Sequence, residues 1–204
     1  MEATISRIIE KEWRMFQAVN AGLARADYQQ TPETFARMRC AQFLAWNEET
    51  CRSYEQDLIH AEADNQNLLE QKYIHMMARC APKNYEVLKA RLPQRTPEHK
   101  ALAQKVNRCL MAETRLVRKQ YPFLNRIGRP LDASGDTEMD TSVETYQLGE
   151  LLTYSQQTLR SLLRHIEDLE KRGESLTMQI QLISLQALGF RSFEDAAELV
   201  ARHS

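Results

Sequence analysis

The feature that most constrains the fold is an apolar repeat in the last third of the chain. Between residues 141 and 172, leucine and isoleucine recur at the three- and four-residue spacing of one helix face. The residues on this face are Leu148, Leu151, Leu152, Leu159, Leu162, Leu163 and Ile166. Thr141 or Ser142 is expected to cap the helix, with Glu144 near its third position. A helix with one long apolar face must pack against other helices.

The rest of the chain has a helix-forming composition. Its 204 residues include only six glycines and six prolines, whereas Ala, Leu, Glu, Gln, Arg and Met are frequent. We therefore predict an all-α protein, with residues 1–204 forming a single helical domain, a bundle of about five to seven helices. A loop is expected at about residues 122–140, where Gly128, Pro130 and Gly135 lie.

Capping residues and breaks give approximate helix limits. Thr31-Pro32 predicts the start of a helix that continues past Tyr54 and Leu58, and Asn67 and Ser192 predict two more starts. The remaining helices are expected at about residues 3–21 (ending at Gly22), 82–90, 97–121, 141–172 and from the break at Gly173 to 188.

Two glutamates fall on apolar helix faces. Glu12 lies within one helical turn of Ile8, Ile9 and Phe16, and Glu144 shares its predicted face with Ser155. Buried carboxylates need partners, because burying them unpaired is unfavourable. Glu12 and Glu144 are therefore the candidate catalytic residues, as general base or metal ligand. The alternative is that Arg, Tyr or backbone groups satisfy each carboxylate and that both merely order the core.

Other polar residues lie near these glutamates or in the same distinctive segments. They are the candidate ligand-binding residues, in which tyrosines would orient a small polar ligand: Gln42, Tyr54, Asp57, Lys72, Tyr73, Tyr146, Glu150, Tyr154 and Ser155. Metal ligation is disfavoured, because Asp57-Leu-Ile-His60 is the only approach to the paired Glu-x-x-His motifs of carboxylate metal bundles. No metal site is assigned, and the cofactor stays open.

The net charge and the absence of targeting signals limit the classes of partner that we expect for this chain. The net charge of −1 gives no global basic field for nucleic acid, and no apolar run approaches a membrane span. The arginine pairs Arg37/Arg39 and Arg126/Arg129 could bind an anionic ligand, but we interpret them as exposed ion-pair partners. The four cysteines lack Cys-x-x-Cys spacing, and we predict that their thiols are reduced. The first residues do not form a secretory signal, so we expect a cytoplasmic location.

Motifs spread over nearly the whole chain form a recognisable set. They are Glu12-Trp13-Arg14-Met15-Phe16, Phe35-Ala-Arg-Met-Arg39 with Gln42 and Trp46, Ser53-Tyr54 with Asp57-Leu58, Asn67-Leu-Leu, Lys72-Tyr73 with Met76-Met77, Pro82 with Tyr85, Tyr121-Pro122, Thr141-Ser142 with Glu144-Thr145-Tyr146, Gly149-Glu150-Leu151, Thr153-Tyr154-Ser155, and the tail from Leu188 to Glu198. With these motifs the chain resembles a bacterial helical family known only as a domain of unknown function, number four-one-two-five. The resemblance implies a bacterial, cytoplasmic protein of one domain with a shared polar site, and it brings no reaction with it.

Three positions depart from the pattern of that family. The pattern has Arg before Asn-Leu-Leu, Glu before Lys-Tyr and Arg before Gly-Glu, and this chain has Gln66, Gln71 and Leu148 there. If those charges serve binding or catalysis in the family, this member is altered or inactive.

Two functions follow as hypotheses. The first is an enzyme or binding protein with an internal polar pocket for a small polar ligand. The second is an accessory module that binds a partner protein, in which the same polar groups form a structural network. A homodimer is compatible with both, whereas nucleic acid and membrane are not expected as partners.

Overall fold

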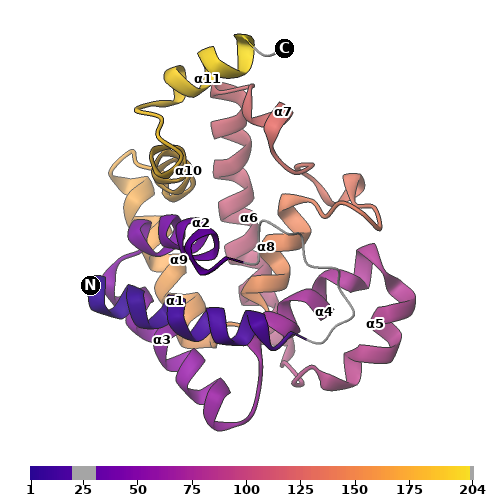
Figure 1. Ribbon diagram of the computed structural model, residues 1–204. Helices are drawn as coiled ribbons and strands as arrows, with labels where there is room; N and C mark the ends of the chain where they lie inside the picture. Colours follow the sequence, from indigo (N-terminus) through magenta and orange to yellow (C-terminus); the bar gives the residue numbers. More distant parts are fainter. Residues whose placement is uncertain (20–30, 203–204) are drawn as a thin grey trace.

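The computed structural model describes residues 1–19 and 31–202, and its elements are helices (Figure 1). The all-α prediction is confirmed, since the described residues contain no strand. Five to seven helices is wrong, because the described residues form eleven α-helices and two 3₁₀ helices. They are α1 (Glu2–Gln17), α2 (Pro32–Ala45), α3 (Glu48–Ala63), α4 (Leu68–Cys80), α5 (Pro82–Leu88), η2 (Lys89–Arg91), α6 (Pro97–Gln120), α7 (Leu124–Ile127), η3 (Ala133–Gly135), α8 (Val143–Leu151), α9 (Gln156–Lys171), α10 (Leu176–Ala187) and α11 (Phe193–Arg202).

The predicted helix over residues 141–172 is two helices, α8 and α9. The Ser155 side chain accepts a hydrogen bond from the Thr158 amide and begins α9 as its N-cap. Asp57 of α3 reinforces the break, because its carboxylate accepts from the Ser155 amide at 2.9 Å and from the Thr158 hydroxyl at 2.7 Å. A capping serine supported by a carboxylate from another helix thus overrides the continuous apolar spacing.

The predicted long helix from residue 31 also divides into two. Its start is confirmed, since Thr31 accepts from the Thr34 amide and Pro32 is the first helical residue. Trp46 is extended, however, and Asn47 caps the new helix α3 by accepting from the Thr50 amide at 2.9 Å. The cap of α4 at Asn67 is confirmed in the same way, with the Glu70 amide as donor.

Two other predicted limits shift. α1 ends at Gln17 rather than near residue 21, and Gly22, its predicted stop, lies outside the described residues. The predicted loop at 122–140 contains one turn of helix, α7, and the short η3. Among the residues described, none of the helices has the length and apolar character that crossing a membrane requires.

The helices enclose one main apolar core. α10 packs against α2 and α6, α4 against α8, and α3 against α1 and α9, and Figure 1 shows α6 running through the middle of the molecule. Fully buried side chains of this core include Ile8, Phe43, Leu58, Leu159 and Leu176. These contacts bring α1, α2, α3, α4 and α8 together around one polar cluster.

The contact between α4 and α8 depends on Gly149. A Cβ atom at this position would lie 3.0 Å from Met76 Cγ and 3.1 Å from the Lys72 carbonyl oxygen. We expect Gly149→Ala to lower the free energy of unfolding by on the order of 1 kcal/mol, because overpacking outweighs the gain in helix propensity. Urea unfolding followed by circular dichroism measures this, and a variant more stable than wild type would contradict the close approach.

Candidate functional site

Seven polar side chains meet inside the apolar core. They come from five helices and one turn: Glu12 (α1), Arg39 and Gln42 (α2), Tyr54 (α3), Lys72 (α4), Glu150 (α8) and Tyr154, which follows α8. We call these seven residues the core polar cluster. Six were predicted as site residues from the sequence, and the structure brings those six together around Arg39.

Glu12 is fully buried and fully bonded. Its carboxylate accepts two parallel hydrogen bonds from Arg39, Nε to Oε2 at 2.7 Å and Nη2 to Oε1 at 2.6 Å. The hydroxyl of Tyr54 donates to Oε1 at 2.7 Å. Such bidentate pairing is the strongest form of ion pair between arginine and a carboxylate, and it fixes the guanidinium plane.

Glu150 is the second anion of the cluster. Its Oε1 accepts from Arg39 Nη2 at 2.9 Å, Gln42 Nε2 at 3.0 Å and the Tyr154 hydroxyl at 2.6 Å. Its Oε2 accepts from Lys72 Nζ at 2.5 Å. Two carboxylates therefore alternate with two cations, which compensates the buried charge of each.

The acidic and basic side chains of the cluster stay ionised although they are buried. Burial alone would raise the pKa of Glu150, but the charges of Arg39 and Lys72 outweigh it and hold that pKa well below its usual range. Burial also acts against charge on Arg39 and Lys72, yet the neighbouring carboxylates raise the pKa of both. Burial and the adjacent glutamates raise the pKa of Tyr54 and Tyr154 well above the ordinary value. At neutral pH Glu150, Arg39 and Lys72 are thus charged and both tyrosines are protonated.

Arg39 is the residue that sequence reasoning missed. The sequence predicts Arg39, like Arg37, to be an exposed ion-pair partner. Arg39 does form ion pairs, but its predicted exposure is wrong, because it is only 8% exposed. A signal was present: Arg39 follows Phe35 by four residues and precedes Trp46 by seven, which places it on the apolar face of α2. Arg37 is exposed as predicted.

Glu144 does not join the core polar cluster. It is half-buried, and its carboxylate accepts from the Ala133 amide at 2.8 Å, which ties α8 to the preceding loop. Asp57 and Ser155 also lie apart from the cluster, in the cap of α9. The catalytic role of Glu12 and Glu144 stays a prediction, but the two carboxylates have different partners.

Two more predicted tyrosines lie beside Lys72. Its ammonium is 3.6 Å from the centre of the Tyr146 ring, and Arg129 lies 4.9 Å from the same ring. Burial raises the pKa of Tyr73, which is half-buried on the same helix as Lys72. Tyr146 therefore connects the cluster to the loop that carries Arg129.

A cavity of about 340 Å³ opens next to the cluster, between α2, α6, α8 and α10. Arg39, Gln42, Glu150 and Tyr154 contribute to its wall, whereas Glu12 does not. Its apolar wall is formed by Met38, Trp46, Leu110, Val143, Leu151, Leu162, Leu176 and Ile180. Apolar walls with a few convergent polar groups are the usual composition of small-molecule sites.

Two arginines complete the wall of this cavity. Arg129 donates to the Thr141 carbonyl at 3.1 Å and lies 3.8 Å from Asp140. Arg118 donates to the Arg129 carbonyl at 3.0 Å, and no carboxylate of the described ranges 1–19 and 31–202 lies within ion-pair distance of it. Arg118 is therefore a cation with capacity for an external anion.

The fold and the cluster define an all-helical protein with a buried network of alternating charges beside a cavity. The model of a family described as a protein of unknown function (DUF4125) matches residues 2–198, and the chain belongs to this family. No curated protein and no solved structure matches the chain.

Two of the three positions that depart from the expected pattern are neighbours in the structure. Gln71 Nε2 donates to Gln66 Oε1 at 2.6 Å, so the two residues are partners. The amide pair satisfies only part of Gln71, because its Oε1 is buried and has no donor among the described residues. The third departure, Leu148, lies on a different face of α8, in a second cavity that Glu150 does not line.

Proposed function

We propose that this protein binds a small organic acid, a molecule with an apolar body and one carboxylate, in the cavity beside the core polar cluster. The observation that carries the proposal is the composition of that cavity, with an apolar wall and three arginines against one glutamate. The predicted binding residues Gln42, Tyr146, Glu150 and Tyr154 line this cavity or its mouth.

The anionic end of the ligand is assigned to Arg118. Arg39 already forms ion pairs with Glu12 and Glu150, and Arg129 forms one with Asp140. Arg118, in contrast, donates hydrogen bonds only to neutral acceptors. A carboxylate at Arg118 would gain charge-assisted hydrogen bonds without displacing an existing ion pair. The apolar body would then lie against Leu110 and Ile180.

Binding fits the cluster better than acid–base chemistry. Each oxygen of Glu12 and Glu150 already accepts hydrogen bonds inside the cluster, and a general base needs a carboxylate oxygen free to reach the substrate. We therefore assign Glu12 the role of orienting Arg39, with Glu150 forming the polar floor of the cavity.

Octanoate tests the proposal, with octanol as its neutral analogue. We expect isothermal titration calorimetry to detect saturable binding of octanoate to wild type and weaker binding of octanol. Replacing Arg118 by Gln should weaken octanoate binding by about tenfold, the effect of losing a charge-assisted hydrogen bond.

Arg108→Gln is the matched control, because Arg108 is an exposed arginine of the same helix that does not line the cavity. Its affinity for octanoate should equal that of wild type. Equal loss in both variants would mean general electrostatic attraction, and no binding to wild type would refute the proposal.

A structural role for the cluster is the second candidate. The hydrogen bonds of the cluster favour this role, because a protein donor already bonds each carboxylate oxygen of Glu12 and Glu150 and no ligand is needed to satisfy them. In that case the cluster orders the core of an accessory protein, octanoate does not bind, and substitutions in the cluster change stability alone.

A further inference from the structure

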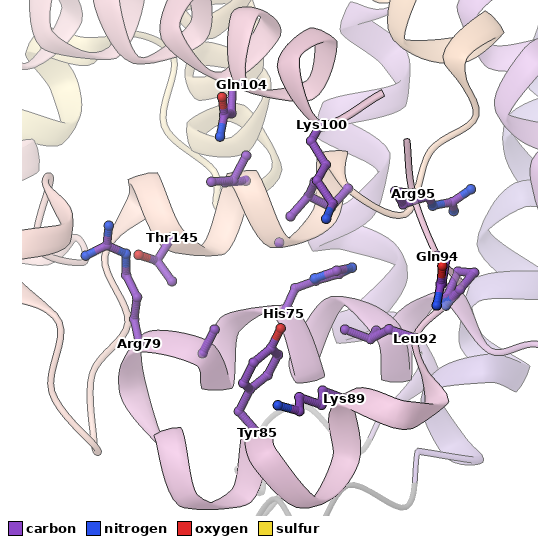
Figure 2. Close-up of a pocket in the computed structure, with 15 residues that line it drawn as sticks. His75, Arg79, Tyr85, Lys89, Leu92, Gln94, Arg95, Lys100, Gln104 and Thr145 are labelled. Carbon is purple, nitrogen blue, oxygen red and sulfur yellow. The ribbon is translucent and has the colours of Figure 1, made fainter. Parts of the chain in front are cut away.

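A second cavity, of about 480 Å³, lies between α4, α5, α6 and α8 (Figure 2). It uses Thr145, Leu148, Gly149 and Leu152 of the α8 segment, none of which lines the cavity beside the core polar cluster. The two cavities therefore lie against different faces of α8. None of the predicted site residues lines this second cavity.

The charged side chains in its wall all have the same sign. Arg79, Lys89, Arg95 and Lys100 line it, and no carboxylate of the described part of the chain does. Figure 2 shows these cations on different sides of the cavity, with Arg79 far from Arg95 and Lys100. In a chain whose net charge is −1, this is a local concentration of positive charge, and a partly enclosed cavity strengthens its field.

Two of these cations have no partner in the described part of the chain, whereas Lys89 forms an ion pair with Glu86. The side chains of Arg79 and Lys100 make no hydrogen bond or ion pair within residues 1–19 and 31–202. Arg95 donates from Nη2 to the Thr153 carbonyl at 3.0 Å, but its Nε is buried and has no acceptor among the described residues. Buried donors are rarely left unsatisfied, so the Nε of Arg95 is a donor that a ligand acceptor could satisfy.

Neutral hydrogen-bonding groups lie between the cations. Figure 2 shows the hydroxyl of Tyr85 directed toward His75 near the middle of the wall. Burial, with the positive charges of Arg95 and Lys100, lowers the pKa of His75 to about 4. His75 is therefore neutral at physiological pH, and its imidazole can donate to or accept from a ligand without adding charge.

We propose that this cavity binds a small molecule with a phosphate or diphosphate group. Phosphate oxygens would accept from Arg95 and Lys100, which supply charge and donors from the linker and α6. Arg79 lies at the other side of the cavity (Figure 2), as does Lys89, which is paired with Glu86. A group with several anionic oxygens matches several separated cations better than one carboxylate does. Hydrogen bonds from Tyr85 and His75 would orient the rest of the ligand.

Inorganic pyrophosphate is the probe for this proposal. We expect titration calorimetry on the full chain to show saturable binding, with a stoichiometry of about one pyrophosphate per chain. Lys100→Gln and Arg95→Gln should each weaken the binding by roughly tenfold or more. The imidazole proton signals of His75 should move during the titration, which locates the ligand.

Lys105→Gln is the matched control, since Lys105 lies on α6 outside the cavity and faces Glu167 at 3.5 Å. Its affinity for pyrophosphate should stay within about twofold of wild type. Circular dichroism melting checks that each variant is folded. If Arg95→Gln is unfolded, Lys100→Gln decides the test, because it removes no hydrogen bond or ion pair within the described residues. No binding by wild type, or equal weakening in Lys100→Gln and Lys105→Gln, would overturn the proposal. Neither outcome depends on octanoate binding in the other cavity.

Discussion

Replacing Arg39 by Met is expected to lower the free energy of unfolding by about 3–5 kcal/mol, which is the effect of removing one partner from a buried ion pair. Among the residues that the structure describes, Arg39 is the only one that forms an ion pair with both Glu12 and Glu150. Without it, Glu12 keeps Tyr54 as its donor but stays in a site with no solvent exposure. Urea unfolding monitored by circular dichroism measures the loss.

Arg37→Met is the matched control for this substitution. Arg37 lies on the same helix, is exposed and makes no ion pair within the described residues, so its loss should change stability by less than about 0.5 kcal/mol. Similar losses in both variants would contradict the burial of Arg39. A loss below about 1 kcal/mol for Arg39→Met alone would mean that Glu12 is not buried as a charged partner.

Glu150→Gln is expected to cost about 2–4 kcal/mol at neutral pH, because Arg39 and Lys72 then lose their shared counter-charge. The effect should depend on pH. The pKa of Glu150 is lowered in the folded protein, so its charge stabilises the fold above the pKa of the unfolded chain, about 4.3. This contribution is lost as the pH falls through the lowered value.

The measurement is the difference in unfolding free energy between wild type and Glu150→Gln at several pH values. We expect a constant difference above about pH 5 and a difference that shrinks as the pH falls further. Comparing two proteins cancels the titration of other carboxyl groups to first order. A difference that grows on acidification would mean that the pKa of Glu150 is raised rather than lowered, and the electrostatic account of the cluster would be wrong.

Local signals in the sequence predict helix starts well. Thr31, Asn67 and Ser192 each accept from the backbone amide three residues on, as their residue types indicate. Helix ends and breaks inside apolar repeats are harder to predict. The break before Ser155 depends on Asp57, which is 98 residues away in the chain, and no spacing rule contains that contact.

The sequence is enough to predict the glutamates and tyrosines of the core polar cluster, but not the arginine at its centre. A glutamate among isoleucines, as at Glu12, stands out because it breaks an apolar pattern. Arg39 lies in a segment in which apolar and polar residues occur on every side of the helix, with Met38 and Cys40 beside it, so its place on the inner face of α2 is less evident. Glu144 fits the periodicity of an unbroken helix, and once the helix divides, it pairs with the loop at Ala133 instead.

The two tryptophan indoles provide the most direct test of the proposed ligand site. Trp46 lines the cavity beside the core polar cluster, whereas Trp13 packs against Phe16 and Phe35 and does not line it. In a titration with octanoate followed by two-dimensional NMR, we expect the indole N–H signal of Trp46 to move and saturate while that of Trp13 stays in place. A Trp13→Phe variant assigns the two signals. If the Trp46 signal does not move, or if both signals move alike, the cavity is not the binding site for the organic acid.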